Sequence, residues 1–138
     1  MESDLERFVA AQDRVWPAIL DELGAGAKRT HWMWFVFPQI VGLGSSAMAA
    51  EYAIASLDEA RAYLAHPVLG PRLMAVTRLM LAQAGRPAEA VLGGIDALKF
   101  RSSMTLFAAA APDEAAFSDA LAAFFAGEAD PRTLARLG

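Results

Sequence analysis

The sequence predicts an all-α protein, a compact bundle of six to eight helices, several of them short, in which residues 1–138 form a single domain. Three observations support this class. Apolar residues recur at helical spacing along most of the chain, capping signals precede several of these runs, and alanine supplies much of the 56% hydrophobic fraction. Alanine is the strongest helix former, whereas no second β-patterned run exists to pair with a strand.

Local signals place the first two helices. The first begins at Ser3-x-x-Glu6, a capping box in which the serine side chain accepts a hydrogen bond from a free amide and the glutamate reaches back. Gly24 and Gly26 end this helix, and Pro17 predicts a kink or a restart inside it because proline removes one backbone hydrogen bond. The apolar run 32–37 fits a short helix or a strand, and we prefer the helix because no partner strand is apparent.

Capping and proline signals place the remaining helices. Ser56-x-x-Glu59 is a second capping box. The helix that begins there ends before His66, because Pro67 disfavours α geometry in the residue that precedes it. Asp130-Pro131 has the aspartate-cap, proline-first signature of a last short helix. These helices are expected from Ser45 or Ser46 to Ala55, from Ser56 to just before His66, from about Val68 to Ala84, for one turn after Pro87, from Asp96 to Ala111, from Asp113 to Ala126 and from Arg132 to Leu137.

Composition and charge exclude several classes of function. Twelve basic against sixteen acidic side chains give a net charge of −4, which disfavours general nucleic-acid binding. The longest apolar run has far fewer than the ~20 residues that cross a bilayer, and the acidic N-terminus is unlike a signal peptide, so we expect a cytoplasmic location and no membrane association. Without cysteine and with two histidines, the chain lacks the ligands of a zinc site, and no metal or cofactor is predicted.

The most unusual stretch is Lys28–Gln39, which holds two of the three tryptophans and one of the two histidines. It is typical of a pocket wall, in which tryptophans stack on a planar ligand, cations hold an anion and polar side chains orient both. The residues in these three roles are Trp32 and Trp34, Lys28 and Arg29, and His31 and Gln39. The structural alternative is that the aromatic side chains belong to the core, which for large apolar residues is the more common place.

A second stretch, Lys99–Thr105, combines two cations with two serine hydroxyls near the start of a predicted helix. Lys99, Ser102 and Ser103 share one helix face. Arg101 is rotated away from this face but remains within reach of a ligand that lies across the first turns. Such a helix N-terminus is suited to bind an anion. The alternative is an exposed polar face opposite the apolar face of the same helix.

Two residues are candidates for moving protons. His31 lies within the first stretch, and Glu51 lies on the helix that follows the Gly42–Ser46 turn. Glu51 would act as a general base if it turned toward the pocket, although a glutamate in such a place is more often solvated.

Several long segments resemble one known family. They are Thr30–Gln39, Gly42–Ser46, Glu51–Ile54, His66–Gly70 and Lys99–Phe107. Over nearly its whole length the chain resembles the bacterial domain-of-unknown-function family 1810, sometimes labelled calpastatin-like. The resemblance implies an all-helical, single-domain cytoplasmic protein without an established activity. The calpastatin label implies protease inhibition, but calpastatins are disordered and this chain is globular. A looser similarity to helical NADAR domains, which act on ADP-ribose-type linkages, is a fold-level analogy.

Three functional hypotheses remain. The first, which we prefer, is a pocket between Lys28–Gln39 and Lys99–Ser103 that binds an anionic planar ligand, a nucleotide or an ADP-ribose-like molecule. Hydrolysis of that ligand, and hence enzymatic activity, is left open. The second is a non-enzymatic module that binds a protein partner through Trp32 and Trp34. The third is that both stretches are structural. We expect a monomer or a weak homodimer.

Overall fold

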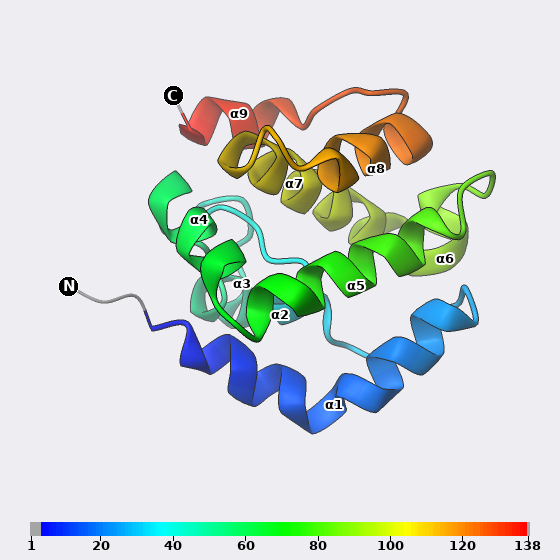
Figure 1. Ribbon diagram of the computed structural model, residues 1–138, viewed down its shortest axis with the longest axis horizontal. Helices are drawn as coiled ribbons and strands as arrows, with labels where there is room; N and C mark the ends of the chain where they lie inside the picture. Colours follow the sequence, from blue (N-terminus) through cyan, green and yellow to red (C-terminus); the bar gives the residue numbers. More distant parts are fainter. Residues whose placement is uncertain (1–3, 138) are drawn as a thin grey trace.

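The computed structural model describes residues 4–137, which contain nine helices joined by loops (Figure 1). In chain order they are α1 (Glu6–Gly24), α2 (Met33–Val36), α3 (Ala47–Glu51), α4 (Leu57–Ala65), α5 (Leu69–Leu81), α6 (Ala88–Leu92), α7 (Gly94–Ala110), α8 (Ala115–Phe125) and α9 (Pro131–Leu137). The predicted all-α class is confirmed. The number of helices exceeds the predicted six to eight, although each helix lies in a segment where the sequence predicted one; three of them, α2, α3 and α6, have only four or five residues.

The helices pack around α7. Helix α1 packs on α5, α5 packs on α4 and α8, and α7 contacts α4, α6, α8 and α9. Figure 1 shows α1 along one side of the molecule and α9 along the opposite side, with α5 and α7 between them. Because α7 is central, even its hydroxyl side chains are buried, and Ser102 and Ser103 are 6% and 0% exposed. The alternative expectation of an exposed polar face on this helix is therefore wrong.

Helix α1 continues through Pro17 as a single element. Figure 1 shows that its two halves meet at an angle, which agrees with the kink expected from a proline that removes one backbone hydrogen bond. Its buried face includes Phe8, Ile19 and Leu23. Ser3 of the predicted capping box lies outside the described residues.

Helix α3 ends at Glu51, four residues before the predicted Ala55. The backbone of Ile54 instead pairs with the segment before α3: its N–H donates to Gln39 O at 2.9 Å and its carbonyl accepts from Val41 N at 2.8 Å. The Ile54 side chain is fully buried there. The buried Ile54 side chain and its two backbone hydrogen bonds thus stabilise the fold more than one further turn of helix α3 would.

Helix α7 begins at Gly94, two residues before the predicted cap at Asp96. The residue that precedes the helix is Gly93, whose φ of +88° is a conformation that glycine adopts far more readily than other residues. Asp96 therefore lies inside the first turn, and its carboxylate is turned toward two lysines. The predicted caps at Ser56 and Asp130 are confirmed, since their side chains accept from the amides of Glu59 and Thr133.

The two stretches singled out in the sequence meet in the core. The Phe37 and Phe100 rings pack edge to face with their centroids 4.9 Å apart, and both side chains are fully buried. This contact joins the chain after α2 to the second turn of α7, so the polar residues that flank each phenylalanine emerge near one another. Among residues 4–137, no helix combines the length and the apolar character that a membrane crossing requires.

Candidate functional site

A cavity of about 360 Å³ lies where the loop after α1, the start of α2 and the start of α7 meet; we call it the lysine pocket. Its lining comes from both stretches, from the end of α6 and from the first turn of α7. The residues are Lys28, His31, Met33, Trp34, Leu92, Gly93, Gly94, Ile95, Asp96 and Lys99. The structure thus brings together four of the predicted site residues, Lys28, His31, Trp34 and Lys99.

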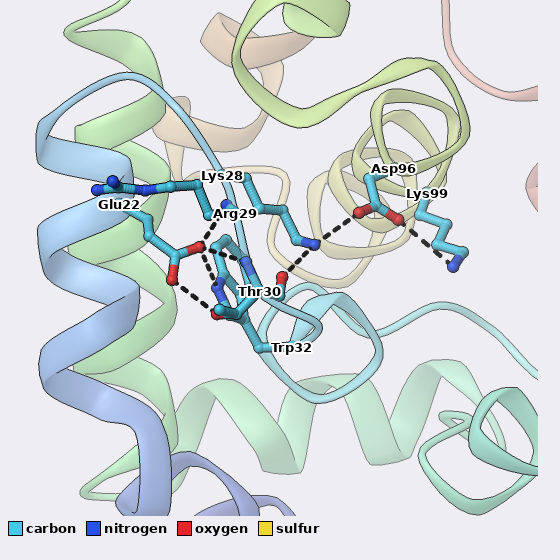
Figure 2. A network of polar contacts seen from close by, with 7 residues as sticks. All are labelled: Glu22, Lys28, Arg29, Thr30, Trp32, Asp96 and Lys99. Atoms are coloured by element: carbon cyan, nitrogen blue, oxygen red, sulfur yellow. Dashed lines mark hydrogen bonds and ion pairs between the residues drawn. The ribbon is translucent and has the colours of Figure 1, made fainter.

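The carboxylate of Asp96 lies between two ammonium groups (Figure 2). Lys28 Nζ is 2.8 Å from Asp96 Oδ2, and Lys99 Nζ is 3.5 Å from Asp96 Oδ1. These two lysines are the only ones in the chain, and the side chain of Lys28 is 6% exposed. Two ammonium groups and one carboxylate leave a net charge of +1 in the pocket. The sequence predicted Asp96 only as a helix cap, because its closer partner, Lys28, lies more than sixty residues away in the chain, whereas Lys99 is three residues away on the same helix.

Each lysine also lies over a tryptophan ring. Lys99 Nζ is 4.8 Å from the ring centroid of Trp34, which is half-buried at the pocket wall. Lys28 Nζ is 5.0 Å from the ring centroid of Trp32 and donates a hydrogen bond to Thr30 O at 2.6 Å. The aromatic rings therefore help to hold the two ammonium groups in place.

A buried glutamate, Glu22 on α1, holds the loop that carries Lys28 and His31 (Figure 2). Its Oε1 accepts from Arg29 N at 2.6 Å, from Thr30 N at 2.9 Å and from Trp32 Nε1 at 3.1 Å. Its Oε2 accepts from Thr30 Oγ1 at 2.6 Å. Burial by itself raises the pKa of Glu22, but these hydrogen bonds outweigh it and lower the pKa from 4.5 to about 2.

Sequence reasoning missed Glu22, although one signal was present. It stands three residues after Ile19 and one before Leu23, on the buried side of α1. A charged residue at an inward position of an amphipathic helix indicates a partner in the fold, because an isolated charge is costly to bury.

A second cavity of about 310 Å³, the α7–α9 cavity, adjoins the lysine pocket. Both cavities are lined by Ile95 and Lys99. The remaining lining residues are Gln39, Leu43, Gly44, Leu98, Arg101, Ser102, Asp130 and Arg132. Three more predicted site residues, Gln39, Arg101 and Ser102, thus lie here. Asp130 and Arg132 were predicted only as parts of the last helix.

Asp130 links α7 to α9. Its Oδ2 accepts from Ser102 Oγ at 2.8 Å, from Thr133 Oγ1 at 2.6 Å and from Thr133 N at 3.2 Å. Its own amide donates to Thr105 Oγ1 at 2.9 Å. Burial raises the pKa of Asp130, but the hydrogen bonds from Thr133 and Ser102 reverse the shift and leave the pKa below its usual value. The carboxylate is therefore charged at neutral pH.

Arg101 is largely engaged by the chain that precedes α9. Its Nε donates to Glu128 O and its Nη2 donates to Ala129 O, both at 2.9 Å. Its Nη2 also lies 3.8 Å from Glu128 Oε2. The guanidinium lines the α7–α9 cavity, but its main contacts fix the loop between α8 and α9.

Four predicted site residues do not line either cavity. Trp32 is 1% exposed and is tied to Glu22, so its ring has no free face for a ligand. Arg29 is exposed, and Figure 2 shows its guanidinium on the opposite side of the network from Asp96.

The other two are Ser103 and Glu51. Ser103 is fully buried, and its Oγ has no hydrogen-bond partner within the described residues. Glu51 is exposed at the end of α3, where its carbonyl accepts from Arg7 Nε at 2.8 Å. In residues 4–137 no group of three or more histidine, cysteine, aspartate or glutamate side chains is placed to hold a metal ion.

Comparisons with known proteins support the fold and give no activity. The model of a family described as "Protein of unknown function (DUF1810)" matches residues 2–137. The crystal structure of the conserved hypothetical protein Rv1873 from Mycobacterium tuberculosis is 52% identical in sequence, with a TM-score of 0.95 over 97% of this chain and 96% of that chain. A search of curated proteins finds no match.

Proposed function

The chain belongs to the DUF1810 family, and we propose that its lysine pocket binds an anionic planar ligand, a nucleotide or an ADP-ribose-like molecule. The observation that carries this proposal is the convergence of Lys28, His31 and Trp34 from one stretch with Lys99 from the other on one cavity. Large-scale features agree: an acidic protein with a local cationic cavity is suited to a small anion rather than to a nucleic-acid polymer. A cytoplasmic location, where nucleotides are abundant, is part of the proposal.

The first turn of α7 supports binding of the anionic group. The amides of residues 94–96 belong to the turn in which an α-helix leaves its N–H groups without intrahelical acceptors. These amides and the positive end of the helix dipole attract an anion, and both lysines flank the same turn. Apart from the adjoining residues and the backbone of the helix itself, no atom lies within 4 Å of the place where a Cβ on Gly93 or Gly94 would stand, so a ligand has room to approach the backbone.

Trp34 supports binding of the planar group. It is the tryptophan that lines the cavity, and it offers a large aromatic surface beside the ammonium of Lys99. A cation over an exposed aromatic ring gains only ~0.5–1 kcal/mol, so Lys99 turns readily from the ring to a phosphate. A base or similar ring then takes its place against Trp34.

Asp96 sets the strength of anion binding. Its carboxylate already occupies the space between the two ammonium groups, and an incoming phosphate has to compete with it for both lysines. Removal of this negative charge while the shape of the side chain is kept therefore strengthens binding of an anion.

Hydrolysis, if measured, is assigned to His31. It is the predicted proton-transfer residue that lines the lysine pocket, whereas Glu51 lies at the end of α3 and lines neither cavity. The alternative function, a protein-interaction surface of Trp32 and Trp34, has less support because Trp32 is 1% exposed.

The proposal is tested by NMR of the protein labelled with ¹³C at lysine Cε, which carries two lysine signals. Titration with inorganic phosphate, AMP and ADP-ribose is expected to shift both signals saturably at millimolar ligand. Lys99→Met should weaken binding of these ligands at least about tenfold, because it removes one charge-assisted hydrogen bond, which contributes about 1.5–3 kcal/mol. Arg29→Met removes a neighbouring charge outside the pocket and is the matched control, with an expected change of less than about twofold.

Asp96→Asn completes the set of variants. It should tighten phosphate binding about threefold to tenfold because the competing carboxylate is gone. The proposal would be overturned if none of the three ligands changed the chemical shift of either lysine signal. Equal losses in Lys99→Met and Arg29→Met would also count against it, because they would indicate a general charge effect.

A further inference from the structure

We infer that the α7–α9 cavity is a second subsite of the same ligand site and receives a hydroxyl-bearing group, such as a sugar ring, of a ligand whose anionic group lies in the lysine pocket. This inference rests on the proposed function and narrows its ligand to a phosphorylated sugar or a nucleoside phosphate. It is carried by the contiguity of the two cavities and by the hydrogen-bonding groups that line the second one.

The two cavities form a continuous lining along one face of α7. Ile95 and Lys99 stand one turn apart on this helix and line both cavities. At about 360 Å³ and 310 Å³, each is near the lower end of the ~300–1,000 Å³ typical of ligand pockets. Ile95 and Leu98 are 74% and 65% exposed, and they offer apolar contact to the carbon skeleton that connects the two polar groups.

The α7–α9 cavity presents both donors and acceptors. The carboxamide of Gln39 is half-buried and makes no hydrogen bond within the described residues, so its oxygen and its N–H₂ are both available. Asp130 Oδ1 accepts one long bond, 3.4 Å from Arg132 N, and retains capacity for another donor. The guanidinium of Arg132 donates from Nη2 to Leu43 O at 3.0 Å and keeps other N–H groups.

This mixture fits hydroxyl groups better than a second anion. A hydroxyl both donates and accepts, whereas a phosphate oxygen at neutral pH mainly accepts and would face the Asp130 carboxylate. That carboxylate stays charged because Thr133 and Ser102 hydrogen-bond it. Arg101 is occupied by the carbonyls of Glu128 and Ala129 and adds little for a second phosphate.

Calorimetric titration of the full chain with four probes tests the inference: inorganic phosphate, butyl phosphate, ribose 5-phosphate and pyrophosphate. Butyl phosphate has the same charged group as ribose 5-phosphate but lacks the hydroxyls. The variant is Gln39→Ala, whose side chain makes no hydrogen bond that folding needs. The matched control is Gln83→Ala, the same change at a glutamine that lines neither cavity.

We expect ribose 5-phosphate to bind about tenfold more tightly than butyl phosphate, which corresponds to one or two additional hydrogen bonds. Gln39→Ala should remove most of this advantage and leave the affinity for inorganic phosphate unchanged, while Gln83→Ala should change neither.

Equal affinity for the two esters in the wild-type protein would overturn the second subsite and leave the phosphate site intact. Preference for pyrophosphate over ribose 5-phosphate would overturn it as well, in favour of a second anion site. If inorganic phosphate and all three other probes fail to bind, the proposed function falls, and the inference falls with it.

Discussion

At the scale of single residues, three carboxylates organise the charge of the candidate site. Glu22 holds the loop between α1 and α2, Asp96 bridges the two lysines, and Asp130 joins α7 to α9. Each is close to hydrogen-bond donors or cations, which is what allows a carboxylate to remain ionised in a partly buried place. Glu22 is the most buried of the three, at 4% exposed, and it determines how the loop from Lys28 to Trp32 is positioned.

Glu22→Gln should lower stability in a pH-dependent manner. Because the folded-state pKa lies near 2, below its ordinary 4.5, the ionised Glu22 stabilises the fold above pH 4.5. This contribution is lost as the pH falls from 4.5 toward 2. A shift of this size corresponds to about 3 kcal/mol of unfolding free energy at pH 7. Urea denaturation at pH 7 and at pH 3 measures the difference between wild type and variant, which should be larger at pH 7.

The control for this experiment is Glu51→Gln, the same change at an exposed glutamate on α3. It should alter the unfolding free energy by less than about 0.5 kcal/mol at either pH. A Glu22→Gln protein whose loss of stability is the same at both pH values would contradict the role assigned to the charge.

At the scale of elements, the crossing of α4 and α5 depends on one residue without a side chain. A Cβ on Gly70 would stand 2.1 Å from the carbonyl oxygen of Leu64, closer than any real contact of this kind. The obstacle is backbone rather than a flexible side chain, so the helices would have to move apart. Gly24, the last residue of α1, has no atom within 4 Å of the same position.

Gly70→Ala should therefore reduce the unfolding free energy by about 1–3 kcal/mol, the usual cost of overpacking. Gly24→Ala, the same substitution in open space and helical geometry, should increase it by about 0.5–1 kcal/mol, because the unfolded chain loses conformational freedom. Chemical denaturation of both variants at neutral pH gives the two values. A Gly70→Ala protein that is as stable as wild type or more stable would show that the α4–α5 contact is not as close as described.

The elements also show where local sequence signals apply and where they do not. The serine cap at Ser56 and the Asp130-Pro131 start of α9 depend on side chains within four residues, and both are present as predicted. The glutamate of the predicted capping box, Glu59, accepts instead from the amide of Ala55, the residue before the cap. The end of α3 and the start of α7 differ from prediction, whereas the predicted cap of α3 at Ser46 is present. The segment after α3 pairs with residues 39 and 41, which precede α3, and Asp96 pairs with Lys28 from a loop far away in the chain as well as with Lys99 in its own turn.

At the scale of the whole molecule, residues 1–138 are predicted to unfold as one domain. Residues from α1, α2, α4, α5, α7 and α8 contribute side chains to one apolar core cluster. A core shared in this way favours a single cooperative transition. Urea transitions followed by tryptophan fluorescence and by far-UV circular dichroism should coincide. Two separated midpoints would contradict the single domain.

The predicted oligomeric state, a monomer or a weak homodimer, is tested by sedimentation. Ile95 and Leu98 are the most exposed of the large apolar side chains in the described residues, and they lie beside the two cavities. Sedimentation with and without ribose 5-phosphate would show whether this surface associates when the cavities are empty.

The sequence by itself determined the class of fold, most of the helices and the two stretches that supply the cavities, because periodicity, capping and unusual composition are local properties of a chain. It also identified Lys28, His31, Trp34 and Lys99, which the lysine pocket brings together. Only the tertiary structure decided that Trp32 is buried while Trp34 faces the cavity, and that Glu22 and Asp96 carry the polar network. The physical reason is distance along the chain: Asp96 meets Lys28 across more than sixty residues, and which face of the four-residue α2 is buried depends on the helices that pack on it.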